Sequence, residues 1–440
     1  MILRRSQLAA ALFFLAAAVR LTLIFGMGKA EVGRPEPVKI AITLARTGSF
    51  ADPYALPTGK TAHSPPIYPA IIALPYAIWG DSLDADRARF VLSALAGSAE
   101  YALLPFVSAA LGMGLLPGVV AGAAGALIPL HHWQECQGEF EVAWVAIFLE
   151  VSVILFCRWL ARRKLTSGSA VRSGAWWGAG LLLAPNLAPV LAGFAVVAGG
   201  RLRPGKGHAI RWIALFTAAA TLVLLPWSLR NYALFGNAFF VRNNLGLELY
   251  VSNHDDAVPE MNLNTATPFF QSRHPHASQE AARVVQRVGE TAFERQRLRL
   301  ALDWIRNNPV RFTQLTLLRF RNFWFPGALP RPNMAALWLL TLAAAGGFVG
   351  LCRQNGFAAA VLAAILGPFP VIYYCVQNDL RYQHPIYWAL LLLASSLALR
   401  LTGMDVQDAQ KLGSQLDSDP QGDSQHGQGV GHASRIERVE

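Results

Sequence analysis

Two glutamates follow the first apolar segment of this 440-residue chain, in a stretch (31–80) that is too polar and too rich in proline to cross a membrane. A carboxylate held at a membrane face can serve as a general base, because it can take a proton from a hydroxyl or an amine. The two candidates are Glu31 and Glu36. The alternative is a solvated carboxylate that pairs with Arg34 or Lys39, and the spacing alone leaves both roles open.

Cations that could meet a phosphate stand elsewhere in the chain. Arg381 and His384 lie in NDLRYQHPIYW (378–388), beside an apolar segment. A planar guanidinium matches phosphate oxygens in a bidentate fashion, which favours Arg381 as a phosphate ligand with His384 beside it. The alternative for Arg381 is an interfacial arginine that reaches out of the membrane next to a Tyr/Trp belt.

Further candidate cations are spread over two polar segments. The first segment offers Lys60 and His63, just before a pair of prolines, and the long polar segment offers Arg230, Arg242, Arg319 and Arg321, with aromatic residues between them. For each of these arginines the alternative is a contact with anionic headgroups. Lys60 and His63 have the further alternative of ordinary exposed loop residues.

Motifs for metals and nucleotides are weak or absent in the sequence. His131, His132 and Glu135 have a spacing that suits a metal, but no fourth ligand follows nearby, so no metal site is predicted. No Walker-type or GxGxxG loop occurs, which leaves nucleotide hydrolysis without support. The four cysteines have no CxxC spacing. No cofactor is predicted, and a divalent metal stays open.

The composition places these residues in a membrane protein. The chain is 53% hydrophobic and 15% charged, whereas soluble domains carry about 25% charged residues. Apolar stretches of roughly 20 residues recur, which is typical of a polytopic helical membrane protein. The net charge of +11 fits cytoplasmic loops, lipid headgroups and anionic substrates better than nucleic acid.

The apolar pattern predicts about ten crossings, with both chain ends on the cytoplasmic side. Eight of the expected crossings are single helices, at 8–27, 90–111, 115–130, 142–160, 213–225, 335–352, 357–374 and 388–401. The other two form a hairpin of short helices within 173–200 that turns near Asn186. The segment 67–79 is apolar but too short to cross, so we expect it to lie at the interface. The ionisable residues gather at the ends of the spans.

The chain is expected to divide into four parts. These are an N-terminal transmembrane module (1–227) with an amphipathic first external loop (28–84), an external α-rich subdomain (228–334), C-terminal transmembrane helices (335–401) and a disordered cytoplasmic tail (402–440). Within the external subdomain, helical spacing predicts one helix over 278–307 and a second over 309–323.

An ordered series of motifs adds a resemblance. The series begins with E-x-x-x-I-A at Glu36 and continues through G-x-F and P-T-x-x-T-A-x-x-P-P-x-Y-P, which ends at Pro69. It continues with PWSLRNYALFG (226–236), NNLGLELYVSN (243–253) and LRYQHPIYW (380–388). Together the series resembles bacterial polytopic glycosyltransferases of the GT-C fold, including the protein O-mannosyltransferase and aminoarabinose-transferase relatives of the glycosyltransferase family 39 type.

The resemblance implies sugar transfer from a polyprenyl-phosphate donor at the external face, either metal-independent or metal-assisted. It makes Glu36 the catalytic base, with Glu31 in reserve. The chain departs from the pattern in two places: Pro35 and Pro37 flank the base, and Gln383 stands where relatives have the second arginine of RYR. Phosphate affinity would then rest on Arg381 and on neighbours from the long polar segment.

These observations predict an all-α, GT-C type enzyme of the inner membrane with its site on the periplasmic side. Its partners would be a polyprenyl-phosphate sugar, membrane lipids and an acceptor that is a lipid, a glycan or a protein. A transporter or flippase of lipid-linked sugars would instead show inverted repeats and charges at mid-membrane depth. A non-catalytic scaffold is the third reading. The enzyme reading requires Glu36 and Arg381 to share one cavity.

Overall fold

The computed structural model describes residues 5–28, 32–162, 165–202, 205–237, 239, 241–327 and 330–403. Over these ranges the regular structure is helical, with isolated bridges and no strand. Glu31 lies outside the described residues, as does all but the start of the predicted tail 402–440.

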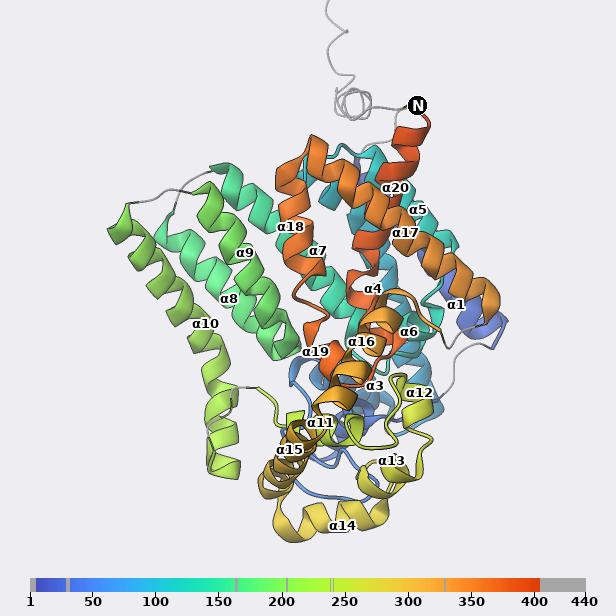
Figure 1. Ribbon diagram of the computed structural model, residues 1–440, viewed down its shortest axis with the longest axis vertical. Helices are drawn as coiled ribbons and strands as arrows, with labels where there is room; N and C mark the ends of the chain where they lie inside the picture. The colour runs from blue at the N-terminus through green and yellow to red at the C-terminus, as the bar shows by residue number, and fades with distance from the viewer. Residues whose placement is uncertain are drawn as a thin grey trace, which may run out of the picture.

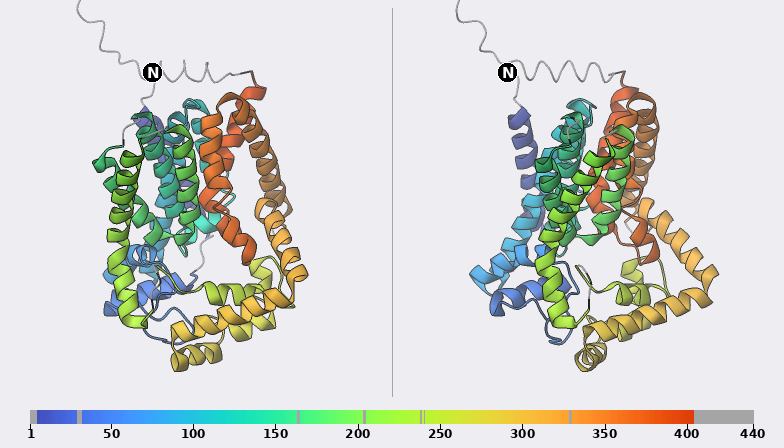
Figure 2. Two further views of the ribbon diagram at one scale, coloured as in Figure 1. Left: turned by 60° about the vertical axis from the view of Figure 1, so that its left-hand side comes forward. Right: turned by 90° about the vertical axis from the view of Figure 1, so that its left-hand side faces the viewer.

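Long apolar helices make up one half of the molecule and run side by side along its long axis (Figures 1 and 2). In the described part of the chain, seven helical segments are long and apolar enough to cross a membrane. They are α1 with the π-helical turn η1 (Arg5–Leu21 and Thr22–Gly26), α4 (Leu83–Ala110), α7 (Val142–Arg162), α10 (Lys206–Phe235), α17 (Arg331–Gln354), α18 with α19 (Gly356–Leu366 and Val371–Cys375) and α20 (His384–Leu401). The predicted all-α membrane fold is confirmed.

The other predicted crossings are shorter helices that stand among the long ones. The span expected at 115–130 is α5 (Leu116–Leu127), and the expected hairpin is α8 (Ser167–Leu183) and α9 (Ala188–Arg201), joined at the 3-10 turn η2 (Pro185–Leu187). One boundary prediction is wrong: α10 passes through Pro226 and ends only at Phe235. A proline inside a membrane helix is tolerated because local adjustments satisfy the freed carbonyl.

The first polar stretch after α1 folds into two helices. Helix α2 (Glu36–Thr47) begins at the candidate base, with Pro35 as its N-cap residue and Pro37 in the first turn. Proline suits this position because the first turn has no hydrogen-bond partner for its N–H groups, and a glutamate there faces the positive end of the helix dipole. Helix α3 (Ile67–Trp79) has the bounds expected for the short apolar segment.

A second helical layer covers one end of the membrane bundle (Figure 2). We call it the cap, residues 245–324. It consists of α11 (Leu245–Ser252), α12 (Met261–Asn264), α13 (Pro268–Arg273), α14 (Gln279–Val288), α15 (Glu290–Asn307) and α16 (Pro309–Trp324). The single helix expected over 278–307 is broken at Gly289, whose φ of +81° lies in the left-handed region that favours glycine.

The cap has a small core of its own, and the first loop contributes to it. Leu247, Val251, Phe293 and Val285 pack together from three cap helices, and Tyr54 of the first loop joins them. The first loop and the cap are therefore packed as one surface, although about 200 residues separate them in the chain.

Ionisable side chains also lie inside the bundle, where the sequence analysis expected none. Glu100 of α4 and Glu150 of α7 are fully buried within spans, and His384 Nε2 lies 3.1 Å from Glu100 Oε2. Arg20 is buried as well, with its Nη2 2.6 Å from Glu135 Oε2. The prediction that ionisable residues gather at the span ends is wrong for Glu100 and Glu150, which lie inside α4 and α7; pairing with His384 makes the burial of Glu100 tolerable.

Candidate functional site

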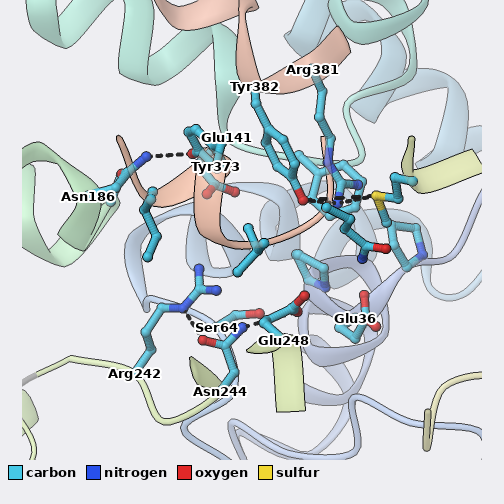
Figure 3. A pocket seen from close by; sticks show the side chains of 18 of the residues that line it. Glu36, Ser64, Glu141, Asn186, Arg242, Asn244, Glu248, Tyr373, Arg381 and Tyr382 are labelled. Carbon is cyan, nitrogen blue, oxygen red and sulfur yellow. Dashed lines mark hydrogen bonds between the residues drawn. The ribbon is translucent and has the colours of Figure 1, made fainter. Parts of the chain in front are cut away.

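A cavity of about 710 Å³ lies where the membrane bundle, the first loop and the cap meet. Figure 3 shows side chains that line it, from α2, the η2 turn, α11, α19, the 3-10 turn η3 (Leu380–Tyr382) and the loops between these elements. Glu36 and Arg381 both line this cavity. The geometric requirement set by the sequence analysis is met.

Glu36 enters the cavity from the first turn of α2, and its side chain is 16% exposed. Its Oε1 lies 3.7 Å from His276 Nδ1. Burial raises the pKa of Glu36, but the charges that the imidazoles of His276, His63 and His274 carry when protonated lower it more, and the net pKa is about 2. At neutral pH Glu36 therefore faces the cavity as a carboxylate.

Two of the imidazoles around Glu36 are uncharged at neutral pH. Burial lowers the pKa of His63 to about 3 and that of His274 to about 4, in spite of the opposing effect of Glu36. The Tyr54 hydroxyl lies 3.1 Å from His63 Nδ1. His63 lines the cavity as the sequence analysis expected, but it lies beside the candidate base as a neutral group.

Arg381 projects from η3 with its guanidinium open to the cavity (Figure 3). The guanidinium lies 3.8 Å above the ring of Phe140, and its Nη2 donates to the Tyr382 hydroxyl at 3.0 Å and to Met261 Sδ at 3.2 Å. Within the described ranges Arg381 makes no ion pair with a carboxylate. A cation in a partly enclosed cavity without an anionic partner is suited to bind an anion.

A second guanidinium reaches the same cavity from the cap side. Arg242 Nε donates to Asn244 Oδ1 at 2.5 Å, and both residues line the cavity. Opposite them, the ring of Tyr382 stacks on that of Tyr373, with 4.1 Å between the ring centroids. The Tyr373 hydroxyl accepts a hydrogen bond from Asn186 Nδ2 at 2.6 Å. The cavity is thus lined by four acidic side chains, two guanidinium groups and a pair of stacked aromatic rings.

The structure places three other predicted phosphate ligands away from the cavity lining. Arg230 donates hydrogen bonds to the carbonyl oxygens of Thr61 at 2.7 Å and Phe50 at 3.1 Å. Its guanidinium therefore links α10 to the first loop. Lys60 is exposed on that loop. His384 is fully buried beneath the cavity against Glu100. None of the three is among the lining residues.

Several lining residues escaped the sequence analysis. Glu248, inside the quoted motif NNLGLELYVSN, and Glu141, directly before α7, both face the cavity. His274 and His276 line the cavity from either side of Pro275, and Asn186 marks the predicted hairpin turn. Their positions in or near the motifs were a signal, but only the folded chain brings them together.

The described residues do not support a metal site. Over that part of the chain, no three His, Cys, Asp or Glu side chains are arranged to hold a metal ion. Glu135 of the HHWQE segment pairs with Arg20 instead. The residues present do not fit the divalent metal that the family resemblance leaves open, and no catalytic step is derived through one.

Comparison with known proteins identifies the fold. No family model matches the chain, and no match was found among curated proteins. Among solved structures the chain is similar to the archaeal oligosaccharyltransferase AglB from Archaeoglobus fulgidus in complex with an inhibitory peptide and a dolichol-phosphate. The identity is 15% and the TM-score 0.50, over 89% of this chain and 50% of that one.

A second structure of the A. fulgidus oligosaccharyltransferase, tethered to an acceptor peptide with the NVT sequon, gives the same TM-score of 0.50 at 15% identity. It covers 89% of this chain and 49% of the other. At such identity the likeness shows the fold. The chain has a GT-C fold. It spans about half the length of the solved structures that it matches, and the family 39 type remains a prediction.

Proposed function

We propose that this chain is a membrane glycosyltransferase that moves a sugar from a polyprenyl-phosphate donor to an acceptor. The observation that carries the proposal is that one cavity at the end of a membrane bundle holds both an ionised carboxylate and guanidinium groups that form no ion pair within the described part of the chain. Such a site can receive an acceptor proton and a donor phosphate at the same time.

The donor would bind with its lipid tail in the membrane and its phosphate at Arg381 and Arg242. These two cations come from opposite sides of the cavity, one from η3 and one from the segment before α11. As the bond between the anomeric carbon and the phosphate oxygen breaks, negative charge grows on the phosphate. Cations fixed beforehand stabilise that charge without reorganising.

The acceptor would approach from the side of Glu36. Its hydroxyl or amide attacks the anomeric carbon, a new bond forms there, and the lipid phosphate leaves with the bonding electrons. Glu36 takes the proton that the acceptor loses. Because the Glu36 pKa is about 2, the carboxylate accepts this proton only late in the reaction, when the acceptor has become strongly acidic. In-line attack would invert the anomeric configuration.

We place the enzyme in the cell inner membrane, with the cavity on the periplasmic side and with a lipid, glycan or protein as acceptor. The cap would serve as a separate external subdomain that walls the acceptor side. AglB is bound to a dolichol-phosphate in one structure and to an acceptor peptide in the other. A lipid-linked donor and a separate acceptor are consistent with those complexes.

Replacement of the base tests the proposal. The acceptor is identified by mass spectrometry, which compares the envelope glycolipids and glycans of cells with and without the chain. For the transfer assay, the full chain is reconstituted in lipid vesicles with polyprenyl-phosphate sugars. We expect Glu36→Gln to remain folded and to lower transfer by about 10²-fold or more. Glu280→Gln, an exposed acid of α14 outside the cavity, should leave the rate unchanged.

A transporter of lipid-linked sugars is the second candidate, and the buried Glu100 and Glu150 favour it, since ionisable residues inside spans often mark translocation paths. The same Glu36→Gln variant separates the two. The measurement is translocation of a labelled lipid across the vesicle membrane. If translocation survives the substitution and the wild-type chain transfers no sugar, the enzyme proposal is contradicted and the transporter is supported.

A further inference from the structure

One acid in the cavity has no role in the scheme above. Glu248 points into the cavity from α11, on the same side as Arg242 and Asn244 (Figure 3). Its Oε1 accepts a long hydrogen bond of 3.4 Å from Asn244 Nδ2. Among the residues that the structure describes, Glu248 makes no ion pair, even with the two guanidinium groups of the same cavity.

An acid in this place is unexpected, because an ionised Glu248 would repel the phosphate that Arg242 and Arg381 attract. In a partly enclosed site, like charges repel each other more strongly than they do in water. The repulsion disappears when the carboxyl is protonated. A neutral carboxyl can then donate its O–H to a phosphate oxygen, and such a charge-assisted hydrogen bond is stronger than one between neutral groups.

The charged and titratable groups around Glu248 come from several elements. The charged groups are Arg242 before α11, Glu36 on α2, Arg381 on η3 and Glu294 on α15. The tyrosines are Tyr382 on η3 and Tyr54 on the first loop. Burial raises the pKa of Glu248 most, Arg242 and then Arg381 lower it, Glu36 raises it, and the net direction is upward. The pKa values of Glu36 and Glu248, two of the carboxyls that line the cavity, are therefore shifted in opposite directions.

We propose that Glu248 binds the donor phosphate as a neutral carboxylic acid, so that the donor binds together with a proton. The inference rests on the proposed function, since it takes the anion at Arg242 and Arg381 to be a lipid-linked phosphate. The bound phosphate adds a negative charge beside Glu248, and this charge strengthens the hold on the proton further. Donor binding and proton uptake are then one linked event.

The linkage has a measurable consequence. Between the pKa of Glu248 in the free protein and its higher pKa in the complex, every unit of pH lowers the affinity for the phosphate by up to about tenfold, because binding must first supply one proton. A phosphate monoester would obscure this effect, since it changes its own charge near neutral pH. The probe is therefore a polyprenyl methyl phosphodiester, which carries one negative charge throughout and contains no sugar to transfer.

The experiment measures binding of this diester to the full chain in detergent by calorimetry, from about pH 5.5 to about pH 8.5. For the wild-type chain we expect the affinity to fall at high pH by about tenfold per unit. In buffers with different ionisation enthalpies, we expect an uptake of about one proton at the high end of the range. Glu248→Gln, a permanently neutral analogue, should bind with an affinity that does not change with pH, close to that of the wild type at low pH. Glu280→Gln is the matched control and should keep the wild-type slope.

Three outcomes would overturn the inference. The first is a wild-type affinity that is constant with pH and involves no proton uptake. The second is a pH slope that persists in Glu248→Gln, for instance one that is lost instead in His276→Asn. The third is no binding of the diester at low pH. The proton-uptake measurement uses the wild-type chain alone, so a Glu248 variant that fails to fold does not block the test.

The test also separates this inference from the proposed function. The diester assay contains neither sugar nor acceptor. If proton-coupled binding is found but the wild-type chain transfers no sugar, the transferase proposal fails and the binding inference stands. If the wild-type chain transfers sugar but binds the diester without a proton, only the role of Glu248 is wrong.

Discussion

Arg381 illustrates how a single side chain is held for an anion. Its guanidinium lies over Phe140 and is fixed by the Tyr382 hydroxyl, and neither neighbour neutralises its charge. The stacking and the hydrogen bond to a neutral acceptor orient the plane of the guanidinium group. A salt bridge would orient it as well but would neutralise its charge, whereas here the full positive charge is left for a ligand. Arg230 is the contrast, since backbone carbonyls take up its donors.

This difference leads to a prediction for Arg381→Lys. Lysine keeps the charge but loses the planar surface that stacks on Phe140 and the second donor that a phosphate can use. We expect the KM for the donor to rise about tenfold or more, with a smaller effect on kcat, in a transfer assay that varies donor concentration. Arg321→Lys, on the exposed side of α16, is the matched control. Equal donor KM values in wild type and Arg381→Lys would show that this guanidinium does not bind the phosphate.

At the scale of elements, the position of Arg381 depends on helix α20, which begins at His384 directly after η3. His384 is held against Glu100 of α4, and Gln383 Nε2 donates to the Phe323 carbonyl at 2.9 Å. Further along, α20 packs closely on α17, where a Cβ added to Gly347 would lie 2.0 Å from the carbonyl oxygen of Leu393. Small residues allow such close contact between membrane helices.

The close contact predicts that Gly347→Ala destabilises the protein. The added methyl group would meet backbone, which cannot move aside as a flexible side chain could, so α17 and α20 must separate. We expect a lower melting temperature in detergent and a reduced transfer rate, because η3 and Arg381 are continuous with α20. Gly199→Ala in α9, where nothing lies within 4 Å of the added atom, should change neither. Equal melting temperatures for the two variants would contradict the packing argument.

Across the whole molecule, the cavity exists because the first loop and the cap are fastened together. Glu290, at the start of α15, accepts hydrogen bonds from the hydroxyl of Thr61 and from the Ala62 N–H, the latter at 2.9 Å. Burial raises the pKa of Glu290 to about 7, and the two hydrogen bonds and Arg230 only partly oppose it. This carboxyl joins the two walls of the cavity and titrates near neutral pH.

A pH dependence of stability follows from Glu290. A carboxyl whose pKa is higher in the folded chain binds its proton more tightly there. It therefore favours folding below its ordinary pKa of 4.5, and this contribution is lost as the pH rises towards about 7. The lowered pKa values of His63 and His274 act in the opposite direction, so we expect the melting temperature of the wild type to fall relative to that of Glu290→Gln between about pH 5 and about pH 8. In Glu290→Gln the amide oxygen can still accept from the Ala62 N–H, and the side chain does not titrate.

Scanning calorimetry of both chains over this pH range is the measurement. Glu248 and Glu294 also have raised pKa values and contribute in the same direction, so the difference between wild type and Glu290→Gln isolates Glu290. Parallel curves for the two chains would show that Glu290 does not titrate in this window.

The amino-acid sequence by itself determined the class of molecule and its elements. Apolar runs of membrane length require helices that satisfy their own backbone, which is why the spans and the short helix α3 could be predicted closely. Motif order and side-chain chemistry also singled out Glu36 and Arg381. These are local properties, since they depend on residue type and on spacing along the chain.

Only the tertiary structure decided which cations face the cavity and which acids are charged. His384 differs from Arg381 by three positions in the chain, yet one is buried against Glu100 and the other opens to the cavity. Glu36 and Glu248 are the same residue type, but burial and neighbouring charges shift their pKa values in opposite directions. Burial and charge pairing depend on contacts between segments far apart in the chain, and local patterns do not contain that information.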